Sequence, residues 1–189
     1  MPGSLSEKDS KLILELREAG VFQDVDQHLI DQSNGIILVT CSDADRFPEI
    51  FSHQVRMQAD CRADPRIHTL AWNGGALACA PNSPINKRRG DEQIFLDQVA
   101  GARELKSINQ VVLGAHWLCG MAAYFHLSLE EVLALQMSAK SEIKRLNRGI
   151  QVACFFPIDY GKKQRTYFLS RPHWEEWAGK SGIPAFAGC

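Results

Sequence analysis

The chain has 189 residues, which fits one compact domain with a substantial core. Its 45% hydrophobic and 23% charged residues are typical of a globular protein, and the net charge of -1 indicates no affinity for nucleic acid or an anionic membrane. Six cysteines are too sparse for a disulfide scaffold, so we expect buried thiols and metal ligands among them. Without a spanning apolar run or a secretory signal at 1–10, the expected location is cytoplasmic.

The first half of the chain predicts a helical arm followed by two strands. Residues 1–20 should form this arm, because a capping serine precedes an apolar stripe that ends at a glycine. The continuous, largely β-branched run 36–40 is typical of a central strand covered on both faces, and Cys41 follows it directly. A second strand is expected over 67–72, ahead of the Asn-Gly-Gly turn at 73–75.

The second half predicts a loop, two long helices and three further strands. The loop is expected at 81–90, the helices at 91–105 and 128–146, and the strands at 111–113, 150–156 and 165–170. We expect the last strand to be antiparallel and at an edge of the sheet, with 171–189 as a C-terminal tail. The aromatic residues of this tail, Trp174, Trp177 and Phe186, could dock on a neighbouring subunit or pack on the protein's own sheet.

Strands that alternate with helices predict an α/β fold with a mostly parallel central sheet flanked by helices, in a single domain spanning 1–189. Ligand sites in such folds gather at the carboxyl ends of the strands. Cys41 follows one predicted strand, and His116 and Cys119 follow another. Each residue alone is more often structural, but two thiolates and an imidazole together suit tetrahedral zinc. We therefore predict that these three residues bind Zn²⁺.

Two motifs resemble the signature of the β-class carbonic anhydrases. They are Cys-Ser-Asp at 41–43 and Gly-Ala-His-x-x-Cys-Gly at 114–120, within a resemblance that covers roughly 32–156. The resemblance implies a homodimer or higher homo-oligomer that reversibly hydrates carbon dioxide to bicarbonate through zinc-bound hydroxide. It also implies that Gln32 binds substrate, and that Asp43 either accepts a hydrogen bond near the zinc-bound water or becomes the fourth zinc ligand.

The chain departs from the family pattern beside this aspartate. In the family, an arginine two residues after the aspartate holds it away from zinc, whereas here the arginine comes one position later, at Arg46. A one-residue shift in an extended segment reverses the direction of a side chain. The family's Arg-Asn pair is altered too, with Trp72 before Asn73. Either Asp43 and Arg46 act as catalytic residues, or Asp43 closes the site.

Three functions remain compatible with this pattern. The first is an active carbonic anhydrase, and the second is a noncatalytic or closed-site zinc domain of the same fold. The third is a hydrolase of another small heteroallene such as carbon disulfide. Release of hydrogen sulfide from carbon disulfide would distinguish this hydrolase from a carbonic anhydrase. A metal-free module with Gly74-Gly75 as the ligand turn is disfavoured, because no Gly-x-Gly-x-x-Gly or P-loop motif is present. The basic run 87–89 is interpreted as a solvated loop rather than a phosphate site.

Overall fold

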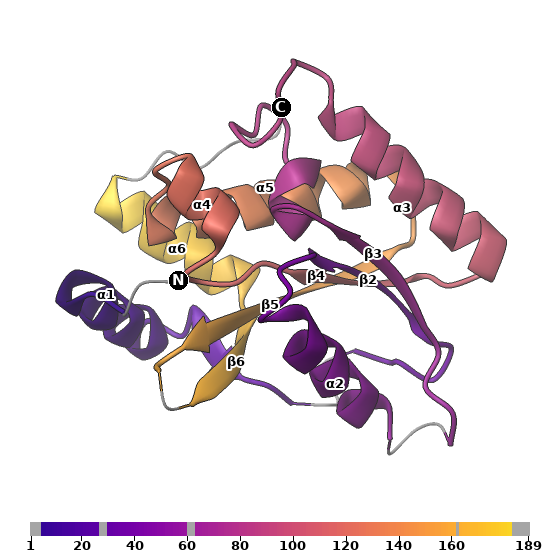
Figure 1. The fold of residues 1–189 in the computed structure, drawn as a ribbon, viewed down its shortest axis with the longest axis horizontal. Helices are drawn as coiled ribbons and strands as arrows, with labels where there is room; N and C mark the ends of the chain where they lie inside the picture. The colour runs from indigo at the N-terminus through magenta and orange to yellow at the C-terminus, as the bar shows by residue number, and fades with distance from the viewer. Residues whose placement is uncertain (1–4, 27–29, 60–62, 162, 183–189) are drawn as a thin grey trace.

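The computed structural model describes residues 5–26, 30–59, 63–161 and 163–182 and contains a six-stranded sheet (Figure 1). The strand order is β1-β6-β5-β4-β2-β3. Strands β2 to β5 are mutually parallel, whereas β6 runs antiparallel to β5 and β1 antiparallel to β6. The strands are β1 (Phe22–Asp24), β2 (Ile36–Cys41), β3 (Ile67–Trp72), β4 (Gln110–Gly114), β5 (Gln151–Asp159) and β6 (Gln164–Leu169).

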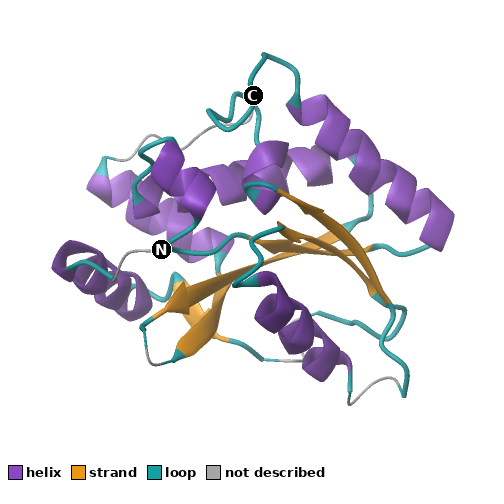
Figure 2. Ribbon diagram, in the orientation of Figure 1, coloured by secondary structure: helices purple, strands orange, loops and turns teal. Residues whose placement is uncertain are grey.

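Helices cover both faces of the sheet, so the fold has three layers (Figure 2). Helices α3, α4, α5 and α6 lie over one face and α2 lies over the other, while α1 lies at the β1 end. The helices are α1 (Glu7–Glu18), α2 (Phe47–Gln58), the short 3-10 helix η2 (Gly75–Cys79), α3 (Glu92–Lys106), α4 (Gly120–Tyr124), α5 (Leu129–Leu146) and α6 (Arg171–Ser181). No helix in these described ranges is long and apolar enough to cross a membrane.

The α/β fold with a mostly parallel sheet is confirmed, together with each helix and strand predicted from the pattern. β2 is a strand because its six residues are all buried between the two helical layers, and Ser128 begins α5 with a complete capping box. The predicted antiparallel strand is β6, but β1 pairs with its outer side and forms the edge. A three-residue strand carries too little periodicity to be recognised in the sequence.

Helices α2, α4 and α6, together with η2, were not predicted. The tail predicted at 171–189 begins with α6, whose Trp174 and Trp177 are buried. The indole nitrogen Nε1 of Trp177 donates a hydrogen bond to Oε1 of Glu15 in α1, at 2.7 Å. These tryptophans therefore pack within the protein itself, while Phe186 lies outside the described residues.

The chain connections leave the carboxyl ends of β2 and β4 in opposite directions. These strands are neighbours, with Val39 opposite Leu113 in the register. The chain leaves β2 towards α2 on one face, and leaves β4 towards α4 and α5 on the other (Figure 1). Ligand sites of α/β folds commonly lie where two adjacent parallel strands send their connections to opposite faces. Cys41 ends β2, and the loop 115–119 leaves β4 at this point.

Candidate metal centre

Gly75 fixes the backbone beside Cys41. Gly75 has φ +53°, and a Cβ there would meet the backbone nitrogen of Cys41, the carbonyl carbon of Thr40 at 2.6 Å and the backbone oxygen of Gly114 at 2.9 Å. Only glycine therefore allows η2 to pack this closely against the ends of β2 and β4. A hydrogen bond also joins the residues that follow β2 and β3, because Oγ of Ser42 donates to Oδ1 of Asn73 at 3.0 Å.

The loop after β4 brings His116 and Cys119 towards Cys41. The backbone nitrogen of Trp117 donates to the carbonyl oxygen of Pro157 on β5, at 3.1 Å. Leu118 adopts φ +65°, a left-handed conformation that is strained for a residue with a side chain. Cys119 then immediately precedes the first residue of α4, Gly120, which ends the loop.

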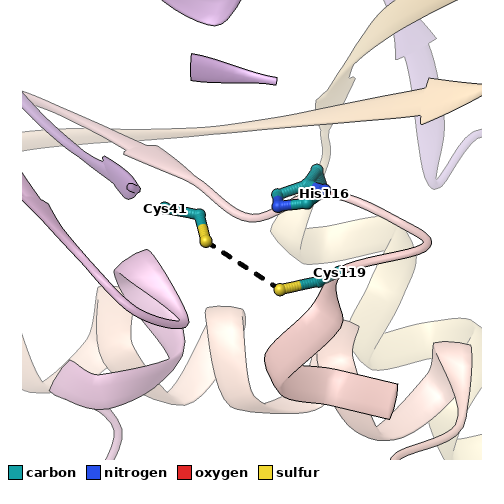
Figure 3. A group of neighbouring side chains, drawn as sticks. All are labelled: Cys41, His116 and Cys119. Carbon is teal, nitrogen blue, oxygen red and sulfur yellow. Dashed lines mark hydrogen bonds between the residues drawn. The ribbon is translucent and has the colours of Figure 1, made fainter. Parts of the chain in front are cut away.

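The three predicted ligands converge, as Figure 3 shows. The Sγ atoms of Cys41 and Cys119 are 3.9 Å apart, and one ligand atom from each of the three residues lies within 4.8 Å of the others. With Zn–S bonds of about 2.3 Å and tetrahedral angles, two sulfur ligands would lie about 3.8 Å apart. The spacing of the sulfur atoms therefore fits a tetrahedral zinc ion. The exposed fractions are 4% for Cys41, 2% for His116 and 2% for Cys119.

The donors of this cluster are suited to a cation. The hydrogen bond from Cys119, aided by the nearby His116 ring, lowers the pKa of Cys41 to about 4, and the same contact raises the pKa of Cys119. The contact therefore favours the charged form of Cys41 and the protonated form of Cys119. Neither ring nitrogen of His116 has a hydrogen-bond partner at normal geometry in the described parts of the chain. A buried polar atom left without a partner is destabilising by about 1–3 kcal/mol, which a metal bond would offset.

Arg46 forms an ion pair with Asp159 at the end of β5, and both side chains are less than one-fifth exposed. The sequence did not indicate this pair, since no local pattern links residues 113 positions apart. The half-buried Asp43 uses Oδ1 to accept a hydrogen bond from the backbone nitrogen of Asp45, at 2.9 Å. Asp43 does not belong to the group of converging ligand atoms found among the described residues.

Gln32 lies towards the opposite end of β2 from Cys41. Its carbonyl oxygen accepts a hydrogen bond from Gly35, in the turn that leads into the strand. At about 3.3 Å per residue, the start of β2 lies roughly 16 Å from Cys41. Gln32 is 3% exposed, and neither amide atom has a partner in the described part of the chain. Within one protein chain, Gln32 is therefore not brought to the three ligands, and its substrate role stays a prediction.

Two other cysteines are ordinary buried thiols. Burial raises the pKa of Cys79 to about 12 and the pKa of Cys154 to about 11, so both remain protonated at neutral pH. Cys61 and Cys189 lie outside the described residues.

No protein-family model matches the chain, and no curated protein is similar enough to count as a relative. Among solved structures, the chain is similar to the β-carbonic anhydrase CafA of the fungal pathogen Aspergillus fumigatus. The two are 14% identical, the match covers 92% of this chain and 94% of that chain, and the TM-score is 0.40. Similarity at this level leaves the family open, so the candidate metal centre depends on the residues of this chain.

Proposed function

We propose that Cys41, His116 and Cys119 bind Zn²⁺ and that the protein catalyses the reversible hydration of carbon dioxide. The observation that carries the proposal is the convergence of two sulfur donors and one imidazole from segments more than seventy residues apart. Zinc with three protein ligands and an open fourth position lowers the pKa of a coordinated water to about 7, which supplies hydroxide at neutral pH.

The chain's own residues would bind and orient the reactants. Asp43 follows Cys41 by two residues, and its Oδ1 accepts a hydrogen bond from the backbone of Asp45, so Oδ2 would be left to accept a hydrogen bond from the water that zinc would activate. Arg46 is paired with Asp159, and its backbone nitrogen donates to the carbonyl oxygen of Asp43 at 3.1 Å, so Arg46 would act by holding the segment that carries Asp43. The role of Gln32 in binding substrate would require a second copy of the chain, since its own strand carries it away from Cys41.

Zinc content and carbon dioxide hydration, measured on the same preparation from about pH 7 to pH 9, test this function. We expect stoichiometric zinc and measurable hydration in the wild type. Cys119→Ala should lose both, because one of the three donors is removed. Cys154→Ala is the matched control, since this buried thiol lies outside the cluster, and it should retain both. Wild-type protein without zinc, or Cys119→Ala with full zinc content, would contradict the proposal.

A closed, noncatalytic zinc site is the second candidate, favoured by the ion pair between Arg46 and Asp159. This pair commits Arg46 elsewhere, so Asp43 is not restrained by it and could supply a fourth ligand. A carboxylate in that position would reduce the Lewis acidity of the metal and exclude water. Cobalt substitution distinguishes the two sites, because Asp43→Ala would change the visible spectrum of a closed site and create an exchangeable position. A spectrum unchanged by Asp43→Ala would exclude Asp43 as a ligand.

Homo-oligomerisation and a cytoplasmic location belong to the same proposal. The β1 edge and the exposed Tyr124, which is 75% exposed, are surfaces that a second copy could cover. Light scattering on the purified protein measures the mass directly. A mass equal to that of one 21.1 kDa chain at micromolar concentration would contradict the proposed homodimer.

A further inference from the structure

A groove of about 370 Å³ lies beside the metal loops and is separate from the metal ligands. One side is formed by Trp72, which lies opposite Cys41 in the strand register, and another by Met121, two residues after Cys119. None of the three metal ligands lines this groove. Its volume lies within the range of about 300–1,000 Å³ that is common for small-molecule sites, and is much larger than carbon dioxide needs.

Five of the nine residues that line the groove are apolar, and part of this apolar wall is rigid. The rings of Trp72 and Phe95 pack with centroids 4.9 Å apart, and Nε1 of Trp72 donates to the carbonyl oxygen of Gly75 at 2.6 Å. This hydrogen bond holds the indole in place. Ile94 also lines the groove and is 60% exposed, an unusual amount for a large aliphatic side chain. Such walls suit a ligand with a flat, apolar body.

The loop at the mouth of the groove, residues 87–92, carries three cations and two acids. Lys87 lines it, and the exposed Arg88 and Arg89 follow on the same loop. Asp91 lines the groove as well, and its Oδ2 accepts a hydrogen bond from the backbone nitrogen of Arg88 at 2.9 Å, while Oε2 of Glu92 accepts from the backbone nitrogen of Gly90 at 3.1 Å. No ion pair of the three cations is found in the described ranges. With three cations and two acids the segment 87–92 has a net charge of +1, and an anionic group at Lys87 would meet a cation that has no ion-pair partner among the described residues.

We infer that this groove binds a small organic anion with a planar apolar body, of the aromatic carboxylate class. The ring lies against Trp72, Phe95 and Ile94, and the anionic group lies at Lys87. This site goes beyond the proposed hydration activity and does not require zinc, because no metal ligand contributes to its walls. The basic run 87–89 thereby acquires a role that a solvated loop would not have.

Calorimetric titration of the full-length, zinc-loaded protein with 2-naphthoate tests the inference, with the uncharged 2-naphthamide as the comparison ligand. We expect 2-naphthoate to bind roughly tenfold more tightly, since one charge-assisted contact contributes about that factor. A third ligand, 2-naphthyl phosphate, shows which anionic group is preferred, and tighter binding of either anion than of the amide supports the site. Equal affinity for all three ligands, or no binding at millimolar concentration, would overturn it.

Two pairs of surface variants locate the binding site. Lys87→Gln should remove most of the preference for the anion, whereas Lys8→Gln, on the exposed face of α1, should leave it unchanged. Ile94→Glu should weaken 2-naphthoate binding, because it places a negative charge in the groove. Leu105→Glu is its matched control on the same helix, since Leu105 is 80% exposed and lies outside the groove. If both members of either pair behave alike, the groove is not the site.

Discussion

Replacing Gly75 with alanine is expected to destabilise the fold and the metal centre together. The added Cβ would overlap the backbone nitrogen of Cys41 and approach the carbonyl carbon of Thr40 to 2.6 Å and the oxygen of Gly114 to 2.9 Å. All three atoms belong to the backbone of the two central strands, so no flexible side chain can move away. The strand end that carries Cys41 must therefore shift.

The expected magnitude follows from two contributions. Keeping a residue with a Cβ at φ +53° is destabilising by about 1–2 kcal/mol. Forcing extra volume into a packed region adds about 1–3 kcal/mol. The free energy of unfolding of Gly75→Ala should thus fall by roughly 2–5 kcal/mol. With a urea m-value of about 2 kcal/mol/M, the unfolding midpoint would fall by roughly 1–2.5 M.

Urea unfolding with and without zinc measures both effects. Gly101→Ala is the matched control, because Gly101 lies inside α3 with no neighbouring atom within 4 Å of an added Cβ. Alanine there should raise the free energy of unfolding by up to about 1 kcal/mol, because alanine favours the helix more than glycine does. Zinc affinity should fall in Gly75→Ala and remain unchanged in Gly101→Ala. If Gly75→Ala unfolds at the wild-type midpoint and retains wild-type zinc affinity, the close packing of η2 against Cys41 is wrong.

Raising the pH from about 8 to about 10 should destabilise the protein, because burial raises the pKa of Cys79 to about 12 and of Cys154 to about 11, whereas unfolded thiols titrate near 8.5. Above that pH the unfolded state binds fewer protons than the folded state, so each thiol lowers the free energy of unfolding by up to about 1.4 kcal/mol per pH unit. In urea unfolding, the Cys79→Ala/Cys154→Ala variant should lose less stability per pH unit than the wild type, and an equal loss would contradict this. Ser128→Ala should lower the free energy of unfolding by about 1 kcal/mol through loss of the capping box, whereas Ser10→Ala, inside α1, should not; equal midpoints in thermal unfolding would argue against the cap. Zinc at about 100 times its dissociation constant should stabilise the wild type by about 2.7 kcal/mol in scanning calorimetry and leave His116→Ala unchanged, and stabilisation of both would point to another site.

The amino-acid sequence alone predicted the alternating α/β architecture and the three residues of the candidate metal centre. Both follow from local chemistry. The buried run that becomes β2 is continuous and β-branched, and Cys41 ends it, while His116 and Cys119 stand on one short loop after β4. Because parallel strands place their carboxyl ends at one edge of the sheet, the proximity of these three residues could be predicted from the sequence pattern.

Only the tertiary structure determined which side chains surround that centre. The sequence left open whether Arg46 pairs with Asp43, and in the structure Arg46 pairs with Asp159, from a strand that no local pattern connects to it. The close approach of Gly75 to Cys41 and the burial of the α6 tryptophans against α1 are likewise contacts between distant segments. Periodicity and capping act over a few residues and so are readable along the chain. Ion pairs and packing depend on how whole layers meet, which is decided when the sheet and its helices assemble.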